Sequence, residues 1–119
     1  MVKEKKRLSK LENTRKKLLR LILADGDLIE GGYGEVLVKC GKAGCHCAKK
    51  PCHLVAKLSF REDGKSKNKV VRVADRENVK RLTDRYREQK QALQELERIS
   101  KMEREILRRV IKRKNRGYD

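Results

Sequence analysis

Two stretches of the chain have the apolar spacing of amphipathic helices. In residues 3–24, apolar residues recur mostly at steps of three and four, and basic residues fill the other face. The apolar positions are Leu8, Leu11, Leu18, Leu19, Ile22 and Leu23. Such spacing places the apolar side chains along one side of a helix. We predict a first amphipathic helix, ended by a C-cap at Gly26.

A second and much longer helix is predicted after Asp75, a residue type that caps helix N-termini. The run from Arg76 to about Asn115 contains no Gly or Pro. Its apolar positions are Val79, Leu82, Tyr86, Leu93, Leu96, Ile99, Met102, Ile106 and Val110. A stripe of this length needs a partner: the first helix folded back antiparallel, a second copy of the chain, or another protein.

Three short strands are predicted between the helices, at residues 35–39, 53–60 and 69–73. The last two form a hairpin joined by a polar loop over residues 61–68, and Gly31, Gly32 and Gly34 are interpreted as turn formers. The fold class is therefore α+β: an N-terminal amphipathic helix, a three-stranded antiparallel sheet and a long C-terminal helix in helical-hairpin or coiled-coil pairing. The corresponding segments are residues 1–26, 27–74 and 75–115.

The composition limits how such a fold is stabilised. The chain has 119 residues, of which 37% are hydrophobic, with no Trp and one Phe. A thick apolar core cannot be built from this content. We therefore expect additional support from a structural metal ion or from oligomerisation.

Residues 40–53 hold all four cysteines and both histidines of the chain. Thiolates and imidazoles are the usual ligands of zinc, and glycines between them let the ligands converge. We predict a structural Zn²⁺ site, a zinc knuckle, bound by Cys40, Cys45 and Cys47. The fourth ligand is either Cys52 or His53, because adjacent residues rarely bind the same ion.

The knuckle is not expected to be catalytic, and the protein is not expected to be an enzyme. A catalytic zinc site normally has a nearby glutamate as general base, and residues 40–53 contain none. No apolar stretch is long enough to span a membrane, and the first residues are charged, without a small-residue cleavage site. We expect a cytoplasmic protein, in which clustered cysteines are metal ligands rather than disulfides.

The charge of the chain is strongly positive, with 34 Lys and Arg against 17 Asp and Glu, a formal net charge of +17. Such chains bind polyanions, and phosphate backbones and anionic membranes attract them by the same electrostatics. We predict DNA or RNA as the partner, in a nucleoid or ribonucleoprotein, with contacts to the backbone because aromatic side chains are few. The candidate binding residues are Lys39, Lys42, Lys49, Lys50, Lys57, Lys65, Lys67, Lys69, Arg72, Arg108, Arg109, Lys112, Arg113 and Lys114.

Residues 28–107 resemble a family of small uncharacterised prokaryotic proteins. The resemblance is carried by Cys40-Gly41-Lys42, Cys45, Cys47-Ala48 and His53, by Gly64-Lys65, and by a long charged helix. Members of that family are often found near transposases and other mobile elements, and the family has no established activity. The resemblance implies His53 as the fourth ligand. This chain departs from the family pattern by adding Cys52, which keeps an all-cysteine site open, and by Leu54-Val55 in place of Gly-Pro-Tyr.

Two functions follow as hypotheses. The first is a zinc-stabilised, non-enzymatic nucleic-acid-binding protein, an accessory factor of a nucleoprotein assembly with a possible mobile-element association. The alternative is an adaptor that docks on a protein partner through the long helix. A continuous basic face favours the first, and an apolar helix stripe left uncovered in the monomer favours the second.

Overall fold

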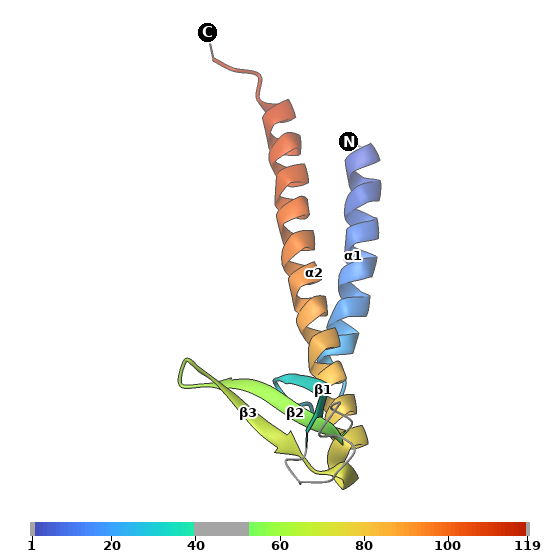
Figure 1. Cartoon of the computed structure of the whole chain (residues 1–119). Helices are drawn as coiled ribbons and strands as arrows, with labels where there is room; N and C mark the ends of the chain where they lie inside the picture. The colour runs from blue at the N-terminus through green and yellow to red at the C-terminus, as the bar shows by residue number, and fades with distance from the viewer. Residues whose placement is uncertain (1, 40–52, 119) are drawn as a thin grey trace. The chain divides into compact units, whose positions relative to one another are not determined.

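The computed structural model describes residues 2–39 and 53–118 (Figure 1). The elements in order are α1 (Val2–Leu23), β1 (Gly32–Val38), β2 (His53–Glu62), β3 (Lys65–Val71), the 3₁₀ turn η2 (Val73–Asp75) and α2 (Arg76–Lys114). The α+β architecture predicted from the sequence is confirmed. The chain divides into two compact units, which are described separately: unit 1 contains residues 1–26 and 88–119, and unit 2 contains residues 27–87.

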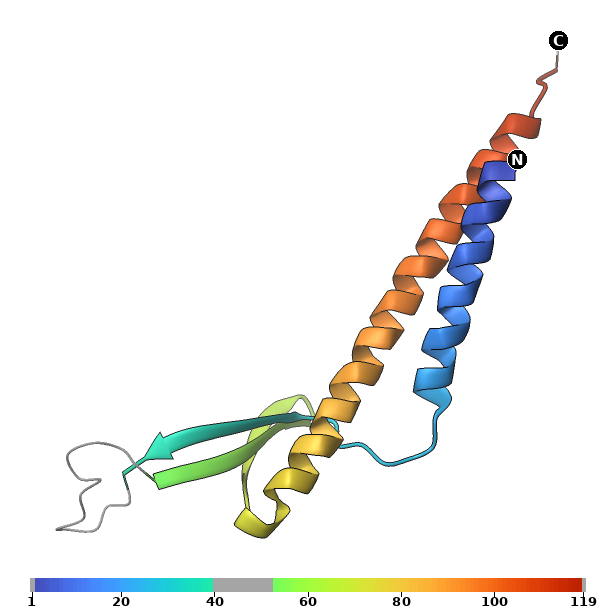
Figure 2. The ribbon, with the colours of Figure 1, turned by 90° about the vertical axis from the view of Figure 1, so that its right-hand side faces the viewer.

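Unit 1 is a hairpin of two antiparallel helices, α1 and the C-terminal part of α2 (Figures 1 and 2). Side chains that are at least partly buried recur along both helices at alternating steps of three and four residues. On α1 this series is Glu4, Leu8, Leu11, Arg15, Leu18 and Ile22. On α2 it is Ala92, Leu96, Ile99, Glu103, Ile106 and Val110. This is the heptad spacing of a coiled coil, so α1 is the partner that covers the apolar stripe of α2.

The seam between the helices, formed by these two series, differs from the predicted stripe in its details. Ala92 is buried at 4% exposure, whereas Leu93, predicted as a stripe residue, is 53% exposed. Ala92 lies seven residues before Ile99, which itself lies seven residues before Ile106, so these three share one side of α2. The larger side chain at position 93 therefore lies beside the seam rather than in it.

Charged residues also occupy the seam, and they pair across it. Glu4 of α1 forms an ion pair with Arg113 of α2, and Arg15 of α1 forms one with Glu103. A hydrophobic pattern cannot identify such positions, because it counts only the apolar members of the series. Polar groups at seam positions favour the one alignment of the helices in which they meet their partners.

Unit 2 is a three-stranded antiparallel sheet in the order β1-β2-β3, together with the first turns of α2. Ala56 of β2 and Val71 of β3 are partners in the register, and both are buried. Thr83 of α2 is 1% exposed, and its hydroxyl donates to the carbonyl oxygen of Val79 at 3.0 Å. The core of this unit is correspondingly small.

Two hydrogen bonds tie the first turns of α2 to other segments of unit 2. The backbone N–H of Ile29 donates to the carbonyl of Leu82 at 3.2 Å. The guanidinium of Arg76 donates to the carbonyl of Leu54 at 2.9 Å. These bonds connect α2 both to the segment before β1 and to the central strand.

Two of the three glycines predicted to form a turn lie in a strand instead. Gly32 and Gly34 lie within β1, where they pair with Ser59 and Lys57. Gly31 has a different role, because a Cβ at that position would lie 2.7 Å from the carbonyl oxygen of Ser59. Glycine is required there by the close approach of two backbones.

The predicted loop over residues 61–68 is also wrong, because β2 and β3 continue through it to a two-residue turn. Asp63 and Gly64 have φ values of 52° and 76°, the positive values of a type I′ turn, which matches the twist of a hairpin. The register of β1 with β2 ends at the pair Gly32 and Ser59. Residues 60–67 therefore form a two-stranded ribbon that extends past β1 and is called the arm below (Figure 1).

Candidate nucleic-acid interface

Three of the predicted binding lysines share one face of the β2–β3 hairpin. Lys65, Lys67 and Lys69 alternate along β3, and all three are exposed. Successive side chains of a strand point to opposite faces, so residues two apart share a face. Phe60 of β2 is the register partner of Lys67 and lies on the same face. The Nζ atom of Lys69 lies 5.5 Å from the centroid of the Phe60 ring, a cation–π distance that holds the ammonium group beside the arm.

Acidic residues near the turn partly balance these lysines. Lys67 forms an ion pair with Glu62 at 3.4 Å, and the two side chains are 47% and 56% exposed. An exposed pair of this kind contributes little to stability, at most about 1 kcal/mol. Lys67 can therefore exchange the carboxylate for a phosphate at small cost.

The opposite face of the hairpin carries hydrogen-bonding side chains. Lys57 and Arg61 of β2 lie on this opposite face, because each is an odd number of residues away from Phe60 along the strand. Arg61 is the register partner of Ser66. The Ser59 hydroxyl donates to the Asn68 side-chain oxygen at 2.7 Å across the strands. Arg61 was not among the predicted binding residues; the Asp63-Gly64 pair is the sequence signal that could have extended the predicted strand to it.

The dimensions of the arm suit a nucleic-acid groove. A two-stranded β-ribbon fits into the major groove of B-DNA, which is about 12 Å wide. Among the described residues no third strand pairs with the arm, because β1 pairs with β2 only as far as Ser59, so the outer edge of β2 is open there. Residues 61–67 are all exposed, with Lys65 and Lys67 on one face of the arm and Arg61 on the other.

A tyrosine on β1 is hydrogen-bonded to an acidic neighbour. The Tyr33 hydroxyl donates to Glu35 at 2.6 Å. This hydrogen bond raises the pKa of Tyr33, and burial and the negative charge of Glu35 raise it further. Tyr33 therefore stays a neutral donor, and its hydroxyl engages one oxygen of the Glu35 carboxylate.

The cysteine-rich segment connects two adjacent strand ends. β1 ends at Val38, β2 begins at His53, and these two residues are register partners. Antiparallel partners have Cα atoms about 4.5–5.5 Å apart, so the sheet brings both ends of the segment close together. Lys39 and His53, which flank the part of the segment outside the described residues, are both exposed.

The other predicted residues of this segment lie outside the described residues. They are Cys40, Cys45, Cys47 and Cys52 with Lys42, Lys49 and Lys50. In residues 2–39 and 53–118, no three His, Asp or Glu side chains gather as a metal site. The choice between Cys52 and His53 as the fourth ligand stays open.

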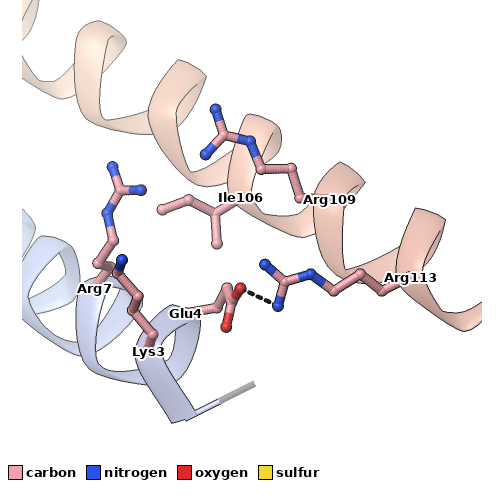
Figure 3. A pocket seen from close by; sticks show the side chains of 6 residues that line it. All are labelled: Lys3, Glu4, Arg7, Ile106, Arg109 and Arg113. Atoms are coloured by element: carbon pink, nitrogen blue, oxygen red, sulfur yellow. Dashed lines mark ion pairs between the residues drawn. The ribbon is translucent and has the colours of Figure 1, made fainter.

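The predicted binding residues of α2 belong to unit 1, where two of them meet basic residues of α1. Arg109 and Arg113 line a cavity of about 110 Å³ with Lys3 and Arg7, around the carboxylate of Glu4 (Figure 3). Lys3 and Arg7 were missed by the sequence prediction, because only the antiparallel alignment of the helices brings them beside Arg109. Four cationic side chains here surround one carboxylate, which gives this end of the hairpin a local positive excess.

The remaining predicted residues are exposed but not part of that cavity. Arg72 directly follows β3, and Lys112 and Lys114 lie in the last turn of α2. Arg108 lies in a mixed cluster with Glu97, Lys101, Arg104 and Glu105. The described candidate residues therefore fall into one group on the sheet of unit 2 and directly after its strands, and another in the C-terminal part of α2 in unit 1.

A family model described as "Domain of unknown function (DUF6788)" matches residues 2–81. The chain belongs to the DUF6788 family. The DUF6788 match takes in α1, all three strands and the first residues of α2, so it includes both the arm and the cysteine-rich segment. No match was found among curated proteins or among solved structures. The expected membership of a small uncharacterised family is thereby confirmed, and no helix of the described residues could cross a membrane.

Proposed function

We propose that this DUF6788 protein is a zinc-stabilised, non-enzymatic nucleic-acid-binding protein that serves as an accessory factor of a nucleoprotein assembly. The observation that carries the proposal is the arm, a two-stranded ribbon with Lys65 and Lys67 on one face and Lys69 at its base. The net charge of +17 supports the same class of partner. The sequence resemblance adds a mobile element as the setting of that assembly.

The arm binds chiefly through phosphates. Lysines at alternate strand positions are about 7 Å apart, close to the spacing of successive phosphates along a strand of nucleic acid. Arg61 on the opposite face can reach a second phosphate row or the edge of a guanine. Since most of these contacts go to the backbone, binding depends strongly on salt and only weakly on sequence.

Zinc has a structural role in this proposal. Cys40, Cys45 and Cys47 would hold the ion, with Cys52 or His53 as the fourth ligand. The pairing of Val38 with His53 favours such a site, because it starts and ends the ligand segment at neighbouring positions. A bound ion contributes folding free energy to a unit whose own core is small.

The proposal is tested by fluorescence anisotropy of the full chain with double- and single-stranded DNA and RNA probes over a range of salt concentrations. We expect tighter binding to duplex than to single strands and a steep loss of affinity with salt. Replacing Lys65, Lys67 and Lys69 together by Gln should reduce the slope of log K against log salt by about 2–3. Binding that does not respond to salt would contradict the proposal.

A charge-matched variant separates the arm from the overall charge of the protein. Lys6, Lys10 and Lys17 are exposed on the outer side of α1 and make no ion pair among the described residues. Their replacement by Gln removes the same charge as the arm variant. We expect it to change the salt slope by less than half as much. Equal losses in the two variants would show that net charge, and not the arm, drives binding.

The adaptor hypothesis stays an alternative with a different surface. In unit 1, α1 already covers the seam of α2, and Ile99 and Ile106 are each 2% exposed. A docking partner would have to use apolar side chains outside that seam.

A further inference from the structure

The helical hairpin of unit 1 exposes apolar side chains outside its seam, and most of them lie on one side. Lys5 and Leu8 of α1 line an apolar groove with Leu107 and Val110 of α2, which identifies this side of the hairpin. Leu19 lies three turns after Leu8, and Leu23 lies one turn further on, so both fall near the same side of α1.

The same side of α2 extends the apolar surface. Ile111 lies one turn after Leu107, and Leu93 lies two heptads before Leu107. The side chains at these positions are between 39% and 75% exposed. They are Leu19, Leu23, Leu93, Leu107 and Ile111, and together they are called the leucine side.

The opposite side of the hairpin is strongly charged at one end. That end carries the cavity lined by Lys3, Arg7, Arg109 and Arg113. Leu21 is also on this side, where a second groove is lined by Leu18 and Ala92 together with Glu88, Gln91 and Glu95. The contrast between the two sides is what a helical hairpin shows when one side faces solvent and the other packs against further helices.

The charges on the leucine side of α2 are self-complementary. Leu93 and Leu107 lie seven residues before and after Ser100. Glu97 and Arg104 lie three residues before and four residues after it, and they carry opposite charges. Within the described part of the chain neither Glu97 nor Arg104 forms an ion pair.

This arrangement fits a second copy of the same helix running antiparallel. With a twofold axis near Ser100, Leu93 faces Leu107 of the second copy and Glu97 faces its Arg104. Each contact is made twice, as the symmetry of an isologous interface requires. A different partner protein would have no reason to match a pattern that is complementary to itself.

We propose that the leucine side is a homodimer interface and that two hairpins form a four-helix bundle across it. The dimer buries leucines that the monomer exposes, and it supplies the extra stabilisation that a chain with little apolar content needs. The charged side stays outside the bundle. The proposal does not depend on nucleic-acid binding, since it concerns only the helices of unit 1.

The test is the mass of the full chain in solution, measured by sedimentation velocity over a range of concentrations. We expect a species of twice the 13.9 kDa chain mass. Leu19→Lys should shift this species toward the monomer. Leu21→Lys is the matched control, because Leu21 is 40% exposed and Leu19 39% exposed on opposite sides of α1. Equal dissociation by both variants would overturn the proposal.

A charge exchange tests the antiparallel contact itself. Glu97→Arg alone and Arg104→Glu alone should each weaken the dimer by at least about tenfold, because each places like charges opposite one another twice. The variant with both substitutions should restore the wild-type dimer. Circular dichroism verifies that the helices persist in every variant.

Two results would overturn the inference. One is a wild-type chain that stays monomeric at every concentration. This result would overturn the inference even if the monomer bound an unrelated protein through the leucine side. The other is a double variant that remains as dissociated as the single variants, since antiparallel pairing requires the rescue.

Discussion

Arg15 of α1 forms an ion pair with Glu103 of α2 inside the seam of the helical hairpin. The two side chains are 31% and 18% exposed, so both charged groups have lost part of their hydration. Their attraction offsets that loss only while both are present. The pair therefore specifies how the helices align more than it stabilises them.

Removing one member of this pair should destabilise unit 1, and removing both should not. We expect Arg15→Leu to lower the free energy of unfolding by about 1 kcal/mol, because it leaves the Glu103 carboxylate beside apolar groups. The double variant Arg15→Leu with Glu103→Leu should regain or exceed wild-type stability. Urea unfolding followed by circular dichroism measures both.

The surface pair of Arg98 and Glu95 serves as the control for that experiment. Its side chains are 68% and 37% exposed, and both belong to α2. Arg98→Leu should change the free energy of unfolding by less than about 0.5 kcal/mol. A double seam variant that is less stable than Arg15→Leu would contradict the interpretation.

Gly31 should tolerate no side chain, unlike the glycines that follow it in β1. A Cβ at position 31 would meet the Ser59 carbonyl oxygen at 2.7 Å, and a backbone oxygen cannot move aside as a flexible side chain can. We expect Gly31→Ala to lower the free energy of unfolding by about 1–3 kcal/mol. Thermal or urea unfolding measures the loss.

Gly34→Ala is the matched substitution, because a Cβ at Gly34 meets nothing within 4 Å. Alanine there should be neutral or stabilising by up to about 1 kcal/mol, since it restricts the unfolded chain. Similar losses at both positions would mean that the close approach at Gly31 is not the cause.

The helices could be predicted from the sequence because their apolar residues follow the helical period over many turns. Their polar seam members could not, since Glu4 and Arg15 look like surface residues until α1 is placed against α2. The same limit applied to Lys3 and Arg7, whose proximity to Arg109 depends on an antiparallel alignment that no single-helix pattern encodes.

The arm was missed for a different reason. The strand from Lys65 to Asn68 consists of polar and basic residues, which lack the apolar alternation of a half-buried strand. Its structure follows from the Asp63-Gly64 turn and from pairing with β2. Lys65, Lys67 and Lys69 were chosen as candidates from their charge, but only the register places them on one face.

The turn of the arm should influence nucleic-acid binding if the arm makes the contact. Gly64 has a φ of 76°, which costs an L-residue with a Cβ about 1–2 kcal/mol. We expect Gly64→Ala to loosen the arm and to weaken duplex binding by about fivefold, the equivalent of about 1 kcal/mol. Fluorescence anisotropy measures the affinity at fixed salt.

Gly64→Asn is the control, because asparagine tolerates positive φ better than alanine does. It should bind closer to wild type than Gly64→Ala does, although both substitutions leave the charge of the protein unchanged. Identical affinities for wild type and Gly64→Ala would argue against a role of the arm.

The fourth zinc ligand should be either Cys52 or His53, and not both. We expect the purified protein to contain zinc and to lose it, with a lower Tm, in Cys40→Ala or Cys47→Ala. Of Cys52→Ala and His53→Gln, only one should reduce zinc content to the same degree, because the residues are adjacent and one ion takes four ligands. Elemental analysis of each variant decides between them. A protein that is prepared without chelator and holds no zinc would refute the site. A loss of zinc in both variants would mean that the residue next to the ligand also matters, because it holds the start of β2 in place.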